Sequence, residues 1–323
     1  MKILVTGAAG FIGSNTCEFL LNKGHHVIAI DNFNSFYHRK IKEFNISEFR
    51  NLPNFILLEG DITNRTFVEN IFKEHKPESI IHLAAWAGVT PSVIEPDIYI
   101  KVNVGGTNNL AEFGVKNGLK TFIFASTSSV YGNNNKTPFT EEMNTDYPEA
   151  PYPATKKSCE VLLYTYYVNF GLNVVNFRIF NPIGIRMRPD LALAKLVRCS
   201  IYGESFPLFM DPKSSRRDYA SVEQIIECFE TFCKTGSGYH ILNLGNSAPR
   251  SLIELKEIVE KLSGRKINLI NDYKPGQMIE TYANIDKAKE TLGYDPKFTL
   301  EQMVVKYYNS FIKQPVLYKK GEY

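Results

Sequence analysis

A tyrosine and a lysine four residues apart, Tyr152 and Lys156, lie in the stretch Y-P-A-T-K. On a helix this spacing places both side chains on one face. A phenol with a pKa of about 10 becomes a usable base when a lysine ammonium and a positively charged nicotinamide ring stabilise its phenolate. Thr127, in A-S-T-S-S-V-Y-G, supplies a hydroxyl that can share a proton with Tyr152 and a substrate oxygen. Because a Tyr–Lys pair alone carries little information, the hypothesis depends on a cofactor site beside it.

The N-terminal stretch predicts such a site. Ile3, Leu4 and Val5 form a β-type apolar run, and glycines follow at positions 7, 10 and 13, before a helical pattern. The spacing is G-x-x-G-x-x-G, which meets the general dinucleotide fingerprint only in part. Glycine is required where the turn is tight, where backbone approaches a phosphate and where the helix packs on the strand. The helix N-terminus, with Phe11 and Ile12, then offers N–H groups to a pyrophosphate.

Asp31 indicates which dinucleotide binds. It ends the next apolar run, HVIAI, at the place where a carboxylate for the adenosine ribose is expected. A carboxylate accepts hydrogen bonds from the two ribose hydroxyls and repels a 2′-phosphate. The sequence therefore favours NAD over NADP.

The elements that position these residues form a regular alternation of strands and helices. This alternation predicts an α/β fold, a Rossmann-type doubly wound parallel sheet, in which ligands bind at the carboxyl ends of the strands. We expect an NAD-binding domain over residues 1–180. The expected strands are 3–5, 26–30, 55–59, 79–84, 121–126 and 172–177, and the expected helices include 65–75, 97–117 and 153–170, the last starting at Pro153.

The pattern changes after residue 180. A Pro/Gly/Arg-rich stretch leads into shorter elements, and we expect residues 181–323 to form a smaller C-terminal α/β lobe that binds substrate, with some of the chain returning to the sheet. Helices are expected at 191–202, 222–233, 252–262 and 299–312, and strands near Phe206 and Tyr219 and at 239–244 and 266–270.

Composition limits the function classes. The 323 residues carry a net charge of +3 with dispersed Lys and Arg, which argues against a nucleic-acid partner. No apolar run approaches the roughly 20 residues of a membrane span, and we expect no signal peptide before the first strand. The five cysteines have no metal-ligand spacing, and no metal site is expected. We expect reduced thiols and a cytoplasmic protein.

At the level of motifs the chain resembles the extended short-chain dehydrogenase/reductases that act on nucleotide sugars. The resemblance runs from residue 1 to about residue 310 and includes the NAD-dependent epimerases and dehydratases. It is carried by TGAAGFIG (6–13), Asp31-Asn32, Gly60-Asp61-Ile62, HLAA (82–85), STSSVYG (126–132), Tyr152-Pro-Ala-Thr-Lys156, RIFNPIG (178–184), Arg217-Asp218-Tyr219 and Pro275-Gly276.

The resemblance implies roles for individual residues. Thr127, Tyr152 and Lys156 would be catalytic. NAD contacts would come from Gly7, Gly10, Phe11, Ile12, Gly13, Asp31, Asn32, Asp61, Ile62, Leu83, Ala84, Ala85, Tyr152 and Lys156. Nucleotide-sugar contacts would come from Ser128, Ser129, Asn181, Arg188, Arg217, Lys274, Gln277 and Thr281.

The triplet Thr127-Ser128-Ser129 separates the reactions of such enzymes. Dehydratases of this type carry Thr-Asp-Glu, since loss of water needs an additional acid and base, and decarboxylases tend to carry Thr-Ser-Glu. The acid-free triplet of this chain resembles the 4-epimerases, which need one base while NAD holds the hydride. A decarboxylase or 4,6-dehydratase that uses the same NAD is the alternative enzyme. An NAD-sensing regulator is the non-enzyme alternative, and it has no need for the catalytic residues.

The sugar is left open between three UDP-sugars. Arg186–Ala192 and MIETYANIDKAKETLGY (278–294) resemble UDP-glucuronate 4-epimerases, in which Arg188 or the triplet hydroxyls could receive a carboxylate. A diphosphate contact or a surface ion pair explains Arg188 equally. Asn181-Pro-Ile-Gly184 resembles UDP-glucose 4-epimerases. A small residue at Thr281 leaves room for the 2-N-acetyl group of UDP-GlcNAc.

Two further expectations concern the nucleotide and the assembly. Lys274-Pro-Gly-Gln277 stands where the family usually has Arg-Pro-Gly-Asp, so an uncharged Gln277 would meet the uridine ribose. Arg217 resembles the diphosphate-binding arginine, and a surface arginine beside Arg216 is its alternative. The resemblance also implies a homodimer through helices near 97–117 and 153–170.

Overall fold

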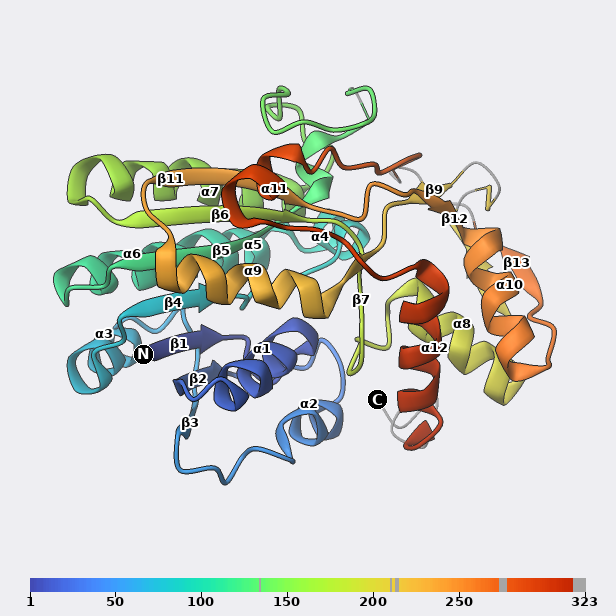
Figure 1. Cartoon of the computed structure of the whole chain (residues 1–323), viewed down its shortest axis with the longest axis horizontal. Helices are drawn as coiled ribbons and strands as arrows, with labels where there is room; N and C mark the ends of the chain where they lie inside the picture. The colour runs from blue at the N-terminus through green and yellow to red at the C-terminus, as the bar shows by residue number, and fades with distance from the viewer. Residues whose placement is uncertain (134, 210, 213–214, 273–277, 316–323) are drawn as a thin grey trace.

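The computed structural model describes residues 1–133, 135–209, 211–212, 215–272 and 278–315. Its centre is a seven-stranded sheet in which every strand pair is parallel and the order is β11-β6-β5-β4-β1-β2-β3 (Figure 1). This confirms the predicted doubly wound α/β class. The strands are β1 (Lys2–Thr6), β2 (His26–Asp31), β3 (Phe55–Glu59), β4 (Ser79–His82), β5 (Thr121–Thr127), β6 (Asn173–Ile179) and β11 (Tyr239–Leu244).

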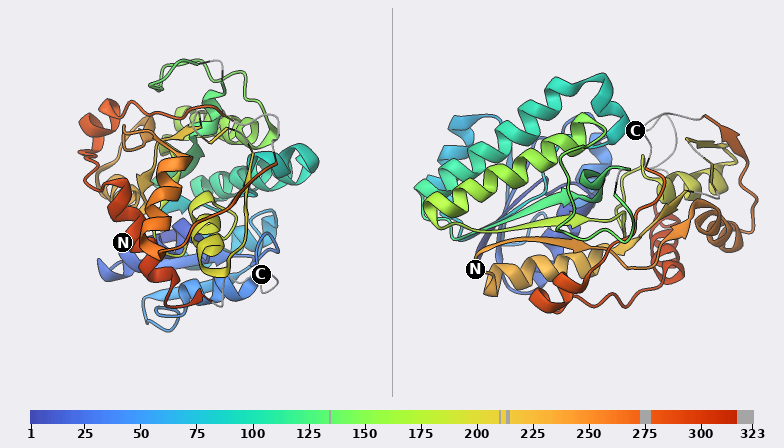
Figure 2. Two further views of the ribbon diagram at one scale, coloured as in Figure 1. Left: turned by 90° about the vertical axis from the view of Figure 1, so that its right-hand side faces the viewer. Right: turned by 90° about the horizontal axis from the view of Figure 1, so that it is seen from above.

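Helices cover both faces of this sheet (Figure 2). One face packs against α1 (Phe11–Asn22), α2 (Arg39–Ile46) and α9 (Val222–Thr235), and the other against α3 (Arg65–His75), α6 (Gly106–Lys116) and α7 (Pro151–Phe170). Strands buried on both faces are apolar along most of their length, as in β5, where all seven residues are buried. The strand order reverses between β1 and β4, which opens a crevice at their carboxyl ends.

The chain returns to the sheet after leaving it. β11 pairs with β6 at the sheet edge, and α11 (Asp286–Leu292) lies near it. The remaining later elements gather at the right of Figure 1, beyond the carboxyl ends of the strands. They are α8 (Ala192–Tyr202), α10 (Leu252–Ser263), α12 (Leu300–Phe311) and the small pairs β8 (Phe206–Leu208) with β13 (Leu269–Asn271) and β9 (Arg216–Arg217) with β12 (Arg250–Ser251).

Several boundaries differ from expectation. Helix α7 begins at Pro151, because Ala150 is the extended N-cap and Pro151 already fits the first turn. Gly171 caps its other end in the left-handed conformation. Tyr219 lies between β9 and β10 (Ala220–Ser221), which pairs with β7 (Pro182–Ile183), and not within a strand. The sequence analysis did not predict α4 (Val89–Ile94) or α11.

The segment expected as one helix over 97–117 has three parts. A short α5 (Pro96–Tyr99) leads into a π-helical stretch, Ile100–Gly105, and then α6. Within the π-helical stretch Asn103 faces the loop after β4, where its Oδ1 accepts from the Trp86 N–H at 2.8 Å and its Nδ2 donates to the Trp86 carbonyl at 3.1 Å. π-helical turns are frequent at functional sites, and this one fixes a loop beside the crevice.

Within the described ranges, no helix is long and apolar enough to cross a membrane. No group of three or more His, Cys, Asp and Glu side chains there could hold a metal ion. The five cysteines are buried free thiols.

Candidate active site

The turn between β1 and α1 is so tight that two of its positions require glycine. Gly7 has φ +69°, and a Cβ there would lie 2.8 Å from the backbone nitrogen of Ala84 on the neighbouring strand end. A Cβ on Gly13 would lie 2.0 Å from the carbonyl oxygen of Gly7. The first glycine therefore permits the turn, and the third permits the helix to pack against it.

The N-terminus of α1 is suited to an anion. Its N-cap, Gly10, provides no side-chain hydrogen bond, and its first turn holds no acidic residue. The backbone N–H groups at this end and the positive end of the helix dipole therefore face the crevice without a carboxylate to compete. This arrangement fits the pyrophosphate of a dinucleotide.

The carboxylate of Asp31 lies beside the glycine turn. Its oxygens accept hydrogen bonds from the N–H groups of Ala9, at 3.0 Å, and Phe33, at 2.8 Å. Buried Lys42 has its Nζ 3.8 Å from the same carboxylate and donates to the side chain and carbonyl of Asn34. Asp31 is thus held rigidly, with hydrogen-bonding capacity left for ribose hydroxyls. Lys42 was not predicted at this site, because only the path of residues 32–42 brings α2 back to β2.

Asp61 follows β3 at the same sheet edge. Its carboxylate accepts from the Thr63 N–H at 2.8 Å and from the Asn32 amide at 2.9 Å. These hydrogen bonds and Lys101 lower the pKa of Asp61, so it is ionised and held in place. The hydrogen bond between Asn32 and Asp61 joins two residues that were predicted to contact the cofactor.

A cavity of about 350 Å³ runs along this edge of the sheet. Every residue predicted to contact the cofactor lines it, so the structure brings the predicted set together. Further residues line the cavity without having been predicted to do so: Lys42, Phe36, Val89, Val102 and Leu191.

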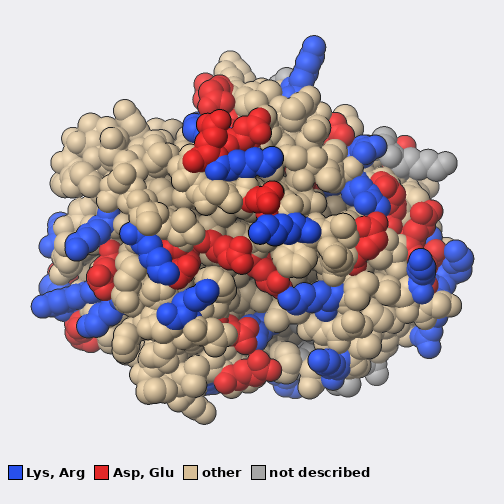
Figure 3. Space-filling model, in the orientation of Figure 1, with Lys and Arg blue, Asp and Glu red and all other residues tan. Residues whose placement is uncertain are grey.

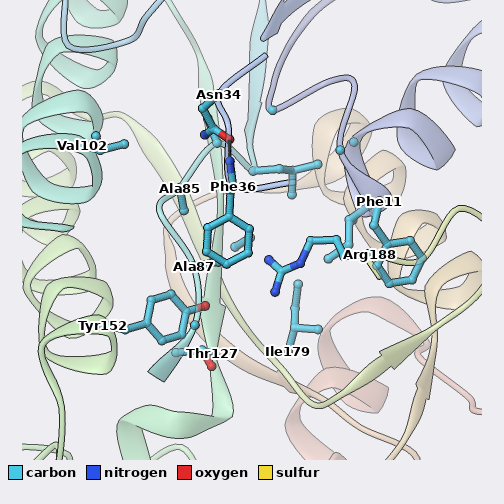
Figure 4. A pocket seen from close by; sticks show the side chains of 18 of the residues that line it. Phe11, Asn34, Phe36, Ala85, Ala87, Val102, Thr127, Tyr152, Ile179 and Arg188 are labelled. Atoms are coloured by element: carbon cyan, nitrogen blue, oxygen red, sulfur yellow. Dashed lines mark hydrogen bonds between the residues drawn. The ribbon is translucent and has the colours of Figure 1, made fainter. Parts of the chain in front are cut away.

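Tyr152, Lys156 and Thr127 line this cavity, and Figure 4 shows Tyr152 and Thr127 next to each other. Tyr152 and Lys156 project from one face of α7, and Thr127 ends β5 opposite them. The Thr127 Oγ1 donates to the Ser129 hydroxyl at 3.3 Å and accepts from the Ser129 N–H at 3.2 Å. Lys156 is 3% exposed, and its Nζ donates to the carbonyl oxygen of Ala125 at 2.8 Å. The site therefore holds a phenol with a hydroxyl beside it and a buried ammonium one helical turn away.

The electrostatics of the pair differ from the expectation. Burial raises the pKa of Tyr152, and the positive charge of Arg188 and the hydrogen bond from Thr127 oppose that rise. The positive charge that lowers the pKa of Tyr152 therefore comes from Arg188, whereas the sequence had suggested Lys156. Burial lowers the pKa of Lys156 to about 8, and the neighbouring Cys159 and Glu160 oppose that fall.

Arg188 points into the larger cavity from the side opposite Tyr152 (Figure 4). Its guanidinium forms two hydrogen bonds to Asp190, at 3.0 and 2.9 Å, and lies 5.2 Å from the centroid of the Phe36 ring. This is an ion pair within a cavity wall, and the guanidinium edge that faces Tyr152 can meet an anion.

A second cavity of about 160 Å³ adjoins the first and shares Ser128, Ser129, Asn181 and Val89 with it. Of the predicted substrate residues, Arg217 and Thr281 line this smaller cavity only. The Asn181 amide donates to the Thr281 hydroxyl at 3.0 Å, which ties two of these residues together. Lys274 and Gln277 lie outside the described residues.

Arg217 is held by backbone carbonyls. Its guanidinium donates to the carbonyl oxygens of Met278, at 2.6 Å, and Ile279, at 3.0 Å. Burial lowers its pKa. Glu149 also lines the smaller cavity, and both of its oxygens accept hydrogen bonds from Asn133, at 3.0 and 2.8 Å.

A parallel sheet of this order, with a glycine turn, a ribose carboxylate and a Tyr–Lys pair at one edge, defines a short-chain dehydrogenase/reductase. The family model described as GDP-mannose 4,6 dehydratase matches residues 4–307. The chain belongs to the extended short-chain dehydrogenase/reductase family of nucleotide-sugar epimerases and dehydratases.

Several relatives and solved structures to which the chain is similar are 4-epimerases of UDP-sugars. The chain is 36% identical over 302 residues to a UDP-glucuronate 4-epimerase of Thermodesulfobacterium geofontis, covering 93% of this chain and 92% of the relative. UDP-glucuronic acid 4-epimerase from Bacillus cereus, solved with UDP-glucuronic acid and NAD, matches with a TM-score of 0.91 and 31% identity over 97% of this chain and 99% of that one. UDP-N-acetylglucosamine 4-epimerase from Methanobrevibacter ruminantium M1 matches with a TM-score of 0.88 and 27% identity, over 97% and 98%.

Proposed function

We propose that the protein catalyses the NAD-dependent 4-epimerisation of a UDP-sugar. The observation that carries this proposal is that Tyr152, Thr127 and Lys156 line one cavity together with every residue predicted to contact NAD, and that Ser128 and Ser129, which carry no carboxylate, line it too. The named activities of the relatives support it. Residues 1–180 would hold chiefly NAD, and residues 181–323 would contribute most contacts to the UDP-sugar.

The chain's own groups handle the proton. The Tyr152 phenolate takes the proton from the 4-hydroxyl of the sugar, and Thr127 orients that oxygen through its hydroxyl. Lys156, one helical turn from Tyr152, would stabilise the phenolate and bind the ribose of the cofactor. NAD, when bound, accepts the C4 hydride and supplies it again. Return of the hydride to the opposite face, after the keto sugar rotates, inverts C4.

The comparison with a dehydratase favours epimerisation. The matched family model carries a dehydratase's description, yet loss of water across C5–C6 needs an acid and a base near the sugar. This chain has hydroxyls at positions 128 and 129. Glu149, the carboxylate lining the smaller cavity, is engaged by Asn133. The described site therefore offers a base for one hydroxyl proton, which is what epimerisation needs.

UDP-glucuronate is the sugar nucleotide that we favour, followed closely by UDP-GlcNAc. Arg188 presents a guanidinium to the cavity that holds Tyr152, where a uronate carboxylate could reach it or the hydroxyls of Ser128 and Ser129. UDP-glucuronate 4-epimerases occur among both the relatives and the structural neighbours. Thr281, small and lining the second cavity, keeps UDP-GlcNAc open.

We also propose a cytoplasmic homodimer. Helix α7 exposes apolar side chains on its outer face, with Val161, Tyr164 and Val168 at 55%, 49% and 59% exposure. The area at the upper left of Figure 3, where Figure 1 places the end of α7, shows no charged side chain. An apolar helix face of this kind fits pairing with the same face of a second copy. Buried free cysteines suit a reducing compartment.

The test is to incubate purified protein, without added cofactor, with UDP-glucuronate, UDP-GlcNAc, UDP-glucose and GDP-mannose and to follow the products by NMR. We expect the 4-epimer of a UDP-sugar and no net change in absorbance at 340 nm. Stoichiometric reduction of the cofactor would instead indicate a dehydrogenase, and a 4-keto-6-deoxy product a dehydratase.

A further inference from the structure

A buried ion pair lies one helical turn beyond the catalytic lysine. Tyr152, Lys156 and Glu160 follow one another at four-residue intervals along α7 and therefore share one face of the helix. The Glu160 carboxylate accepts from Arg178 of β6 through both oxygens, at 3.0 and 2.9 Å, and each side chain of the pair is 1% exposed. The guanidinium of Arg178 in turn lies 4.8 Å from the centroid of the Tyr131 ring.

The same carboxylate also binds the catalytic strand. The Ser126 hydroxyl donates to Glu160 Oε1 at 2.6 Å, and Ser126 directly precedes Thr127. On the other side of Ser126, the carbonyl of Ala125 accepts from Lys156 at 2.8 Å. The end of β5 is thus joined to α7 at two successive residues, and these two contacts set how Thr127 faces Tyr152.

We propose that Glu160 is a positioning residue for the reaction: through Ser126 it holds Thr127 opposite Tyr152, and it places a carboxylate one helical turn from the Lys156 ammonium. The proposal rests on the proposed function. Arg178 anchors the carboxylate from β6, so Glu160 cannot turn toward the ammonium and leave the strand.

The charged groups around Lys156 indicate how the Glu160 carboxylate acts on this ammonium. Lys156 faces Phe124, whose ring centroid is 4.6 Å from its Nζ, His82 of β4, and Cys159 and Glu160 of α7. Burial lowers the pKa of His82 and raises that of the Cys159 thiol to about 11, so both are neutral near pH 7. Lys157, 3.8 Å from Glu160, and Arg178 are cations that face the carboxylate. Glu160 is therefore the anion that opposes the desolvation of Lys156.

The first test variant is Glu160→Gln, which keeps the side-chain shape and removes the charge. We expect kcat to fall roughly 10- to 100-fold with little change in KM, since misplaced reacting groups cost up to about 10²-fold. Loss of the anion lowers the pKa of Lys156, so the alkaline limb of the kcat profile should move down by about one pH unit. Glu230→Gln is the matched control: Glu230 is also buried, accepts from His25 at 3.2 Å and lies on α9 across the sheet, and we expect wild-type kinetics.

A second variant separates positioning from folding, because Glu160→Gln leaves a buried guanidinium without its carboxylate and lowers stability. Replacing both partners, Glu160→Leu with Arg178→Met, should restore most of the melting temperature, since apolar residues often replace a buried ion pair without loss. We expect kcat to stay low in this double variant. Recovery of kcat together with the melting temperature, or wild-type kcat and pH profile in Glu160→Gln, would overturn the proposal.

Cofactor affinity gives a readout that does not require turnover. Trp86 is the single tryptophan of the chain and lies between two residues that line the cavity, so its fluorescence can report NAD binding. We expect NAD affinity to fall with rising pH as Lys156 loses its proton, and to do so about one pH unit lower in Glu160→Gln. The same pH midpoint in both proteins contradicts the proposal. A wild-type protein that epimerises no UDP-sugar overturns the proposed function alone, because this titration still tests Glu160.

Discussion

Lys156 Nζ donates to the carbonyl oxygen of Ala125 at 2.8 Å, and this contact joins the catalytic helix to the strand that carries Thr127. The buried ammonium is thereby held one turn from Tyr152 and aimed at the cofactor cavity. Its pKa of about 8 leaves it mostly protonated at neutral pH. The positions of Tyr152, Lys156 and Thr127 are therefore set by helix α7 and strand β5.

Tyr152→Phe removes the proposed base and leaves the ring. We expect kcat to fall by about 10²- to 10⁴-fold, the usual range for a general base. The affinity for NAD, measured by Trp86 fluorescence, should change by less than about threefold, since the phenol oxygen is one of many contacts. A variant that keeps most of its turnover would show that another group takes the proton.

Arg188→Met removes the cation that faces Tyr152 and keeps an unbranched side chain. Because the positive charge lowers the pKa of Tyr152, its loss raises that pKa and makes the phenolate scarcer at a given pH. The acid limb of the kcat profile should therefore move up by about one pH unit. Arg198→Met is the matched control, since Arg198 pairs with Glu204 and lines neither described cavity. An unmoved limb would show that Arg188 does not tune the base.

The same variant, tested on two substrates, shows whether Arg188 binds the uronate carboxylate or a feature that both substrates share. If its guanidinium receives a uronate carboxylate, KM for UDP-glucuronate should rise about tenfold or more, with less change for UDP-glucose, because only the uronate loses a charged hydrogen bond. Equal changes for both substrates would place Arg188 at a feature that the two share, such as the diphosphate. Steady-state kinetics on the two substrates decide the matter.

Gly13→Ala tests the packing of the cofactor turn. The added Cβ would lie 2.0 Å from the Gly7 carbonyl oxygen, so the turn or the helix must move. We expect a stability loss of about 1–3 kcal/mol, typical of overpacking, and loss of copurifying NAD. Gly105→Ala is the control, because a Cβ there meets nothing within 4 Å and its φ is helical. Thermal unfolding and NAD content of both variants are the measurements, and equal results for the two would argue against the role of Gly13.

Val168→Glu places a charge on the exposed face of α7. If two copies pair through this face, burying an unpaired charge costs several kcal/mol and the dimer should dissociate. Light scattering coupled to size exclusion should show a dimer for the wild type and a monomer for the variant. Ile270→Glu, a similarly exposed apolar site on β13, should stay dimeric. A dimeric Val168→Glu protein would move the interface elsewhere.

Local patterns were enough to predict the sheet, and they indicated residues that the fold brings to one cavity, Thr127, Tyr152 and Lys156; their catalytic role stays a prediction. Helix 65–75 begins and ends as expected, and Thr127 and Tyr152 meet because the carboxyl end of a parallel strand and the start of the following helix share one sheet edge. The spacing of the glycines also predicted the tight turn. A positive φ at one position and a close helix contact at another exclude almost every other residue.

Contacts between distant segments were not predictable in this way. Lys42 reaches Asp31 because α2 folds back on β2, and Phe36 lies against Arg188 across the cavity. The π-helical turn at Asn103 depends on the loop at Trp86 that it holds. Likewise, the run over 239–244 showed a strand but not that it would pair with β6 in the main sheet. Such features depend on tertiary packing, which periodicity does not encode.

The most direct test of the central claim, that one hydride leaves C4 and returns to it, uses a UDP-sugar labelled with deuterium at C4. Wild-type protein carrying its own NAD would convert UDP-[4-²H]glucuronate in ordinary water, and NMR would follow the C4 position. The account predicts a 4-epimer that retains its deuterium at C4, and no deuterium at C4 when unlabelled substrate reacts in D₂O. Exchange of C4 hydrogen with solvent in either experiment would contradict it.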